Sequence, residues 1–328
     1  MELITRVNID RPAWQLTHER PIVAIGSCFA AEIGGRLRDR LYDIDINPAG
    51  TLFNPSSVAA TLRRILDRRP YTADELVKGP DGMWHLMSHH SAFSSVEPAT
   101  VTDRANARQS QAAAMLCMKD AVLVVTFGSA RAFRHIASGE IAGNCHKLPA
   151  QEFAVEDLSL EHITADWDAL VRRLKTCNPT LRIIFTVSPV RHKAYGLVAD
   201  RLSKSTLILA CHRLMAQHSD TIDYFPAYEI FTDELRDYRF YAADMVHPSD
   251  TGADYVFERF ASSYISDSDR KLDRRCLSLT RRLGHRFLGE RTPAAAEFEA
   301  ATASLSDSLC AVSPHIANAI HRLKQELS

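Results

Sequence analysis

The sequence lacks the features that mark several large classes of protein. No apolar run approaches the roughly 20 residues that a membrane-spanning helix needs. The 39 basic and 40 acidic residues leave a net charge of −1, so the electrostatic footprint of a nucleic-acid-binding protein is missing. The first residues, MELITRVNIDRPAW, have neither the basic start nor the apolar core of a signal peptide. We therefore expect a cytoplasmic protein that binds neither membranes nor nucleic acid.

The cysteines lack any pairing pattern. There are seven, an odd number, and no two have the CxxC spacing of redox and zinc sites. A chain of 328 residues can bury a sizeable core without disulfide bonds. We expect reduced thiols.

Short apolar runs alternate with helical stretches along most of the chain. Strands are predicted at 22–25, 121–126, 182–187 and 221–225, with a weaker one at 42–46. Helices are predicted at 28–40, 56–67, 166–175 and 202–217. This alternation predicts a parallel sheet with helices on both faces, which is a three-layer α/β/α fold.

Two segments depart from the alternation. Residues 68–120 read as an insertion near the edge of the sheet. From residue 266 the chain is basic and helical, and after a Gly/Thr/Pro break at 289–293 it ends in an Ala-rich helical tail. We predict a main domain at 1–265 and a helical C-terminal extension at 266–328. We expect the extension to offer a surface for homo-oligomerisation.

Polar segments follow the predicted strands, at the edge where open parallel sheets bind their ligands. The first, Gly26-Ser27-Cys28, places two candidate nucleophiles where a strand gives way to a helix. Unpaired N–H groups and the helix dipole favour a thiolate there, so we expect a lowered pKa for Cys28. Taken alone, the tripeptide also fits a simple Ser27 helix cap followed by a small buried Cys28.

The last polar segment contains Asp244-Met245-Val246-His247. An Asp three residues before a His can fix the tautomer of the imidazole and stabilise the imidazolium. The alternative is a capped turn, in which Asp244 binds local backbone and His247 leads into a helix at 249–263.

The order of these two motifs resembles that of the SGNH (GDSL-type) hydrolases, where Gly-Asp-Ser follows the first strand and Asp-x-x-His follows the last. The chain resembles one branch more closely, the GSCFA family. The stretches that carry this resemblance are GSCFA at 26–30, FNPSSV at 53–58, WHLMSHHSAFS at 84–94, NCHKLP at 144–149, FTVSPVRH at 185–192 and YFPAYEIFTDELRDYRFYAADMVHPS at 224–249. It covers roughly residues 20–262 and implies a flavodoxin-like, SGNH-type fold for the main domain.

The resemblance also implies roles for particular residues. Cys28 lies over the superfamily's nucleophile, while Ser27 lies over its Asp and would need a one-residue shift of the turn to attack. Asp244 and His247 lie over the orienting acid and the base. Gly50 lies over a backbone N–H donor of the oxyanion hole. The N–H of Cys28 is expected to be a second donor, and Gly128 is expected to line the same hole.

The third superfamily block, Gly-x-Asn, reads Gly128-Ser129-Ala130 here and lacks its Asn. Asn144 is the candidate substitute donor, and its simpler interpretation is a turn residue. The remaining candidates are expected to bind substrate, and they are His89, His90, His146, Arg191 and His192. No pair among these histidines has the i, i+4 spacing of a zinc site, so we expect no metal.

These residues together imply an acyl-ester hydrolase or acyltransferase that works through a covalent acyl-enzyme and needs no cofactor. Its substrate would be a small-molecule, carrier-bound or glycan acyl ester. Two alternatives come from other classes. One is an inactive SGNH-fold protein that binds a carbohydrate or a partner protein, as the missing third-block Asn suggests. The other is a protein whose His/Cys cluster holds a metal.

Overall fold

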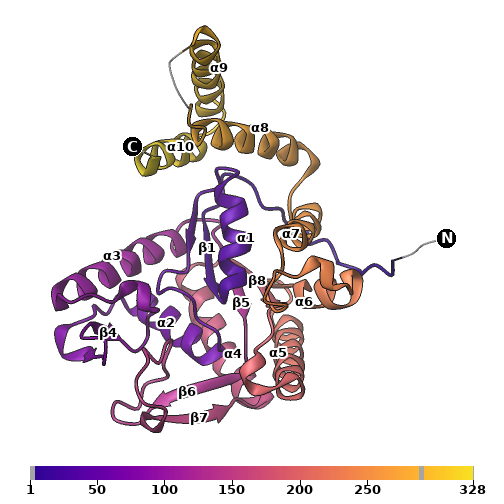
Figure 1. The fold of residues 1–328 in the computed structure, drawn as a ribbon. Coiled ribbons are helices and arrows are strands. Elements are labelled where there is room, and N and C mark those ends of the chain that lie inside the picture. The colour runs from indigo at the N-terminus through magenta and orange to yellow at the C-terminus, as the bar shows by residue number, and fades with distance from the viewer. Residues whose placement is uncertain (1–3, 288–291, 328) are drawn as a thin grey trace.

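The computed structural model describes residues 4–287 and 292–327. The break expected at 289–293 therefore falls largely outside the described residues. The centre of the fold is a five-stranded sheet (Figure 1). In spatial order its strands are β2 (Ile44–Ile46), β1 (Ile22–Gly26), β5 (Val122–Phe127), β8 (Arg182–Val187) and β9 (Ile222–Phe225).

All neighbouring strands of this sheet run parallel. Taken in chain order, the five strands are arranged 2-1-3-4-5, which is the flavodoxin-like order. The predicted three-layer α/β/α fold is confirmed.

Helices cover both faces of the sheet and create two apolar clusters. One face packs against α1 (Cys28–Arg38) and α7 (Asp250–Tyr264). The other packs against α2 (Pro55–Asp67), α4 (Leu160–Cys177) and α5 (Leu197–Gln217). Alternate strand residues point to opposite faces, and both faces of the central strands β1, β5 and β8 are buried, which is why these strands are mostly apolar.

The segment 68–120 contains a small antiparallel hairpin and one long helix. The hairpin joins β3 (Leu76–Lys78) to β4 (Trp84–Leu86). Helix α3 (Pro98–Leu116) contacts both β1 and β2, so it belongs to the helical layers. The part that stands outside the βα alternation is therefore residues 68–97.

Other short elements lie mainly on the loops that follow the strands. An antiparallel pair, β6 (Arg131–His135) and β7 (Phe153–Asp157), projects beyond β5. The sequence analysis did not predict this pair, because charged residues interrupt both strands. A short helix, α6 (Ala227–Glu229), runs into a π-helical turn at Ile230–Leu235. Short 3-10 turns lie at Ala73–Glu75, Ser91–Phe93, Ala150–Glu152, Lys193–Tyr195 and Tyr238–Phe240.

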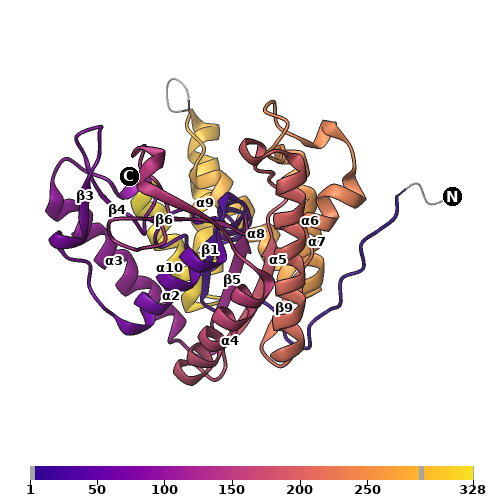
Figure 2. The ribbon, with the colours of Figure 1, turned by 90° about the horizontal axis from the view of Figure 1, so that it is seen from below.

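Three helices form the C-terminal segment: α8 (Asp267–Leu283), α9 (Pro293–Cys310) and α10 (Pro314–Leu327). They lie at the opposite end of the molecule from the β6–β7 pair (Figure 1), and Figure 2 views the molecule from the end that carries that pair. Leu41 inserts into their apolar cluster, and Arg322 forms an ion pair with Asp43 at 2.6 Å. These contacts fix the helices against the start of β2.

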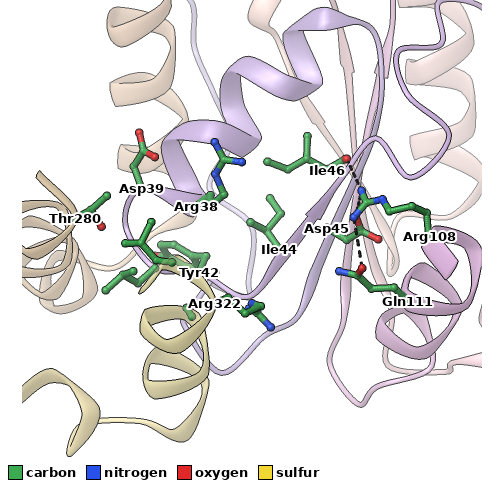
Figure 3. A pocket seen from close by; sticks show the side chains of 13 residues that line it. Arg38, Asp39, Tyr42, Ile44, Asp45, Ile46, Arg108, Gln111, Thr280 and Arg322 are labelled. Atoms are coloured by element: carbon green, nitrogen blue, oxygen red, sulfur yellow. Dashed lines mark hydrogen bonds and ion pairs between the residues drawn. The ribbon is translucent and has the colours of Figure 1, made fainter. Parts of the chain in front are cut away.

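A cavity of about 240 Å³ lies where these helices meet β2 (Figure 3). Arg108 of α3 donates to the buried carboxylate of Asp45 and, at 2.9 Å, to the carbonyl of Ile46. Burial raises the pKa of Asp45. None of the predicted site residues lines this cavity.

The end of β1 depends on the absence of a side chain at Gly26. Gly26 has φ +136°, and a Cβ there would lie 2.1 Å from the carbonyl oxygen of Thr126. Gly35 of α1 has nothing within 4 Å of the corresponding position. The two glycines therefore form a matched pair for substitution.

We predict that Gly26→Ala lowers the free energy of unfolding by on the order of 3 kcal/mol, since strain and overpacking combine there. Gly35→Ala should raise it by up to about 1 kcal/mol, because Ala favours helix. Urea unfolding followed by circular dichroism measures both. Equal effects of the two substitutions would contradict this account of the β1 end.

Candidate active site

The carboxyl ends of β1 and β5 form the topological switch point of the sheet, where flavodoxin-like folds bind their ligands. Gly26-Ser27-Cys28 leaves β1 at this point, and Gly128 follows β5. The two segments lie close together, since a Cβ built on Gly128 would lie 3.3 Å from the Cβ of Ser27. The first and third predicted blocks therefore lie side by side.

The two candidate nucleophiles have different surroundings. Ser27 is 1% exposed, and its hydroxyl accepts a hydrogen bond from the N–H of Phe29 at 3.3 Å as the N-cap of α1. Its own N–H donates to the Thr126 carbonyl at 3.0 Å. Cys28 is only partly buried. Of the two, Cys28 is the more accessible to a substrate.

The sequence led us to expect a lowered pKa for Cys28, but the structure reverses that direction. Burial raises the pKa of the Cys28 thiol, and this effect is larger than any opposing one. Lys204 and the backbone N–H groups of Phe29 and Cys28 act in the lowering direction, while Glu32 adds to the increase. Cys28 is therefore a thiol at neutral pH.

Asp244 and His247 form a tight pair. His247 Nδ1 lies 2.6 Å from Asp244 Oδ2, and the N–H groups of Val246 and His247 donate to Asp244 Oδ1 at 2.9 and 3.0 Å. These bonds, led by the one from the imidazole, hold the pKa of Asp244 well below its usual range. Because an ionised carboxylate only accepts, Nδ1 carries the proton and Nε2 is the basic nitrogen. Asp244 therefore binds local backbone, as in the capped turn, and also bonds to the imidazole of His247.

His192 lies on the loop after β8, near both His247 and the sheet. Its ring contacts Phe53 edge-to-face at 5.3 Å and stacks on Tyr195 at 5.7 Å. Burial lowers the pKa of His192 to about 4, with further contributions from the nearby charges of Lys204 and His247. It is a neutral imidazole at physiological pH.

Lys204 is a buried cation that the sequence analysis missed. It is fully buried on α5, and its Nζ donates to the carbonyls of Gly128 at 2.6 Å and Ser188 at 2.8 Å. Burial lowers its pKa to about 8. The available signal was its position, four residues after Asp200 and on the same helical stripe as Leu207 and Cys211, where an apolar residue is expected.

Electrostatic contacts connect these groups. The charge of Lys204 acts to lower the pKa of both Cys28 and His192, and the charge of His247 also acts to lower the pKa of His192. In the described part of the chain, no hydrogen bond joins Cys28 directly to His247. The Nζ of Lys193 donates to the carbonyl of Asp244 at 2.5 Å, which ties the Asp244 turn to the loop after β8.

Three residues of the predicted oxyanion hole, Gly50, Gly128 and Asn144, form hydrogen bonds within the protein. The N–H of Gly50 donates to the Asn47 carbonyl at 2.7 Å, and that of Gly128 to the Phe53 carbonyl at 2.8 Å. Gly50 has φ +77°, and a Cβ there would lie 2.2 Å from the Cβ of His90. The side-chain oxygen of Asn144 accepts from the N–H of His146 at 2.8 Å, which is the turn role of its simpler interpretation.

Two of the predicted substrate-binding histidines are buried in the region around the β3–β4 hairpin. His89 is 2% exposed and packs edge-to-face on Tyr71 and Phe93 at 4.7 and 4.8 Å. His146 is 3% exposed, stacks on His85 at 4.3 Å and places its Nε2 3.0 Å from the Leu86 carbonyl. Burial lowers the pKa of His89 to about 3 and that of His146 to about 4.

The other three predicted substrate-binding residues, His90, Arg191 and His192, are partly exposed. His90 accepts a hydrogen bond from the N–H of Ala92 at 3.2 Å. The Nε of Arg191 is buried without a recorded hydrogen bond within the described residues, and its charge acts on Tyr228, Tyr241 and Lys204. Arg191 therefore lies in the electrostatic surroundings of Lys204.

The chain also resembles known proteins in sequence. The chain has an open α/β/α sheet with a candidate nucleophile at its switch point. The model of the GSCFA family matches residues 21–260, which is well over half of the chain. The chain belongs to the GSCFA family. A search of the curated proteins gave no match.

The described part of the chain lacks both a metal-binding cluster and a membrane-spanning helix. Within 4–287 and 292–327, no group of three or more His, Cys, Asp or Glu side chains is arranged to hold a metal ion. Over the same ranges, no helix combines the length and the apolar character that crossing a membrane requires.

The burial of His89 predicts a pH dependence of stability. Its folded pKa of about 3 lies below the ordinary value of 6.5, so the unfolded chain binds the proton more readily. The stabilisation is complete above pH 6.5 and is lost as the pH falls from 6.5 toward 3. Urea unfolding measures the free energy of unfolding at pH 7 and at pH 5. The decrease in this free energy between pH 7 and pH 5 should therefore be smaller for His89→Gln than for the wild type.

His162 is exposed and provides the matched control. His162→Gln should leave the difference between pH 7 and pH 5 unchanged. An unaltered pH dependence in His89→Gln would show that His89 titrates alike in the folded and unfolded chain.

Proposed function

We propose that the protein is an acyl-ester hydrolase or acyltransferase that forms a covalent acyl-enzyme on Cys28. The observation that carries this proposal is the placement of a partly exposed Cys28 at the switch point, on the same edge of the sheet as the Asp244–His247 pair. The order of the two motifs along the chain is that of the SGNH hydrolases, which supports the same reaction class.

The state of Cys28 favours attack assisted by a base over a permanent thiolate–imidazolium pair. Since Cys28 is held as a thiol, its proton must leave as sulfur attacks the acyl carbonyl carbon. Nε2 of His247 is the suitable acceptor, and Asp244 stabilises the imidazolium that forms. Contacts between catalytic groups are often long without substrate and tighten in the complex.

The proposed reaction has two halves. In the first, a C–S bond forms, the ester C–O bond breaks, and the imidazolium of His247 returns its proton to the leaving alkoxide. In the second, water or an acceptor alcohol attacks the thioester and gives its proton to His247. A C–O bond forms, the C–S bond breaks, and the departing Cys28 sulfur takes the proton back from His247, which restores the thiol. Water yields the free acid and an alcohol yields a new ester, so the acceptor alone separates hydrolase from transferase. The substrate is a small-molecule, carrier-bound or glycan acyl ester.

A second function, the binding of a carbohydrate or a partner protein by an inactive fold, is favoured by one observation. The N–H groups of Gly50 and Gly128, which would serve an oxyanion, already donate to Asn47 and Phe53. Loss of one oxyanion donor typically costs about 10²–10³ in rate. An acylation experiment decides between the two functions.

Incubation with p-nitrophenyl acetate should acylate Cys28, as peptide mass spectrometry would show. Cys28→Ala should abolish this adduct, and Ser27→Ala should retain it because Ser27 is buried as a helix cap. His247→Ala should slow acylation by about a hundredfold or more, because general-base assistance is lost.

Cys117 is an exposed cysteine that precedes β5, so Cys117→Ala is the matched control and should leave the Cys28 adduct unchanged. An adduct on Ser27 would reassign the nucleophile. No adduct from either oxygen esters or thioesters would favour the binding function. Once an adduct is found, adding alcohols or amines tests whether product is diverted from the free acid.

A further inference from the structure

Lys204 carries a positive charge that is buried without a carboxylate partner in the described part of the chain. An ammonium group loses several kcal/mol of hydration when it leaves water, even after the protein relaxes. The partners of Nζ are two neutral carbonyls, those of Gly128 and Ser188. In the described part of the chain, no carboxylate lies within ion-pair distance of it.

The position of Lys204 connects it to the Cys28 turn. Its Nζ is fixed between the carboxyl ends of β5 and β8 by carbonyls that follow those two strands. Gly128, one of the two anchors, lies close to Ser27, the residue before Cys28, because a Cβ built on Gly128 would lie 3.3 Å from the Cβ of Ser27. A rigid positive charge is therefore held behind the candidate nucleophile, out of reach of solvent and substrate.

We propose that Lys204 is a positioning residue that stabilises the Cys28 thiolate through space. This inference rests on the proposed function for its catalytic meaning, because Cys28 is the nucleophile there. The ammonium offsets part of the cost of forming a negative charge on a shielded sulfur. It also supplies positive potential in a site whose third block lacks its Asn.

Several other charged or titratable groups act on the two partners, and each bears on the pH dependence. The charge of Glu32 of α1 affects the pKa of Cys28. The charges of Asp200 of α5 and Arg191 of the loop after β8 affect the pKa of Lys204. The charge of Lys204 in turn lowers the pKa of His192, and its Nζ lies over the ring of Tyr228 of α6. Among the groups that act on Cys28, Lys204 is the charged side chain that favours the thiolate and Glu32 opposes it. Removing Lys204 should therefore raise the Cys28 pKa further.

The pH dependence has a distinctive form. Below pH 8 Lys204 is charged, so the Cys28 thiolate fraction rises about tenfold for each pH unit. Near pH 8 Lys204 loses its own proton, so it no longer stabilises the Cys28 thiolate. The thiolate fraction therefore rises less steeply with pH in this range. The steeper rise resumes at higher pH, where the thiolate forms beside a neutral lysine. A thiol with no such neighbour gives one smooth titration.

The test measures alkylation of Cys28 by iodoacetamide from pH 6 to pH 10, with the Cys28 peptide quantified by mass spectrometry. The wild type should show the two-step profile with its inflection near pH 8. Lys204→Gln keeps an N–H donor group but removes the charge, so it should show one step and react about tenfold more slowly at pH 7 for each unit by which its Cys28 pKa rises. The difference between the two proteins should narrow above pH 8.

Two further variants complete the test. Lys204→Arg keeps a charge that does not titrate in this range, so it should retain the wild-type rate at pH 7 and lose the flattening. Lys119 is exposed on the loop that precedes β5, at the opposite edge of the sheet, so Lys119→Gln should reproduce the wild-type profile. Circular dichroism establishes that each variant is folded.

A wild-type profile that coincides with that of folded Lys204→Gln from pH 6 to pH 10 would overturn the proposal. An unchanged rate at pH 7 in folded Lys204→Gln would also overturn it and leave Lys204 as a structural tie between β5 and β8. Alkylation reports on Cys28 whether or not the protein transfers acyl groups. A failure of the proposed function would therefore appear in the ester experiment and not in this one.

Discussion

The candidate site depends on the absence of a side chain at Gly26. Thr126 O lies where a Cβ of that residue would be, so only glycine lets β1 stay paired with β5 to its last residue. Ser27 then donates its N–H to the same carbonyl and caps α1, which begins at Cys28. The position of the candidate nucleophile is thus a consequence of strand pairing, and no flexible loop intervenes.

Charged groups lie at two depths on the same edge of the sheet. Lys204 is buried between the ends of β5 and β8, while the side chains of Asp244 and His247 are each about half exposed. The inner charge is fixed by carbonyls that cannot move independently of the strands. The outer pair is held by its own turn and by Lys193, which links it to the loop after β8. The buried cation therefore acts on Cys28 from within the protein, and the Asp244–His247 pair lies nearer the solvent.

Burial on both faces explains how much of the fold the sequence predicts. The three central strands β1, β5 and β8 were placed to within one residue, because a strand covered on both faces is mostly apolar. The outer strands β2 and β9 each contain an Asp and were placed to within two residues. Helix α5 begins earlier than predicted, at Leu197, since Leu197 and Val198 are exposed and give no amphipathic signal. Lys204 and the pKa of Cys28 were missed for a shared reason. How deeply a side chain is buried depends on the packing of segments distant in sequence, and a local pattern does not encode it.

The two opposing influences on Cys28 define when the site is charged. Burial keeps the sulfur protonated, and a thiol is both a weaker nucleophile and less readily oxidised than a thiolate. In our proposal, Lys204 limits the cost of ionisation without making the thiolate the resting state. In the proposed reaction, the negative charge would develop only as His247 receives the proton, and the buried ammonium would interact more strongly with that developing charge than with the neutral thiol. An interaction that strengthens along the reaction coordinate lowers the barrier, whereas one already complete in the resting enzyme would not.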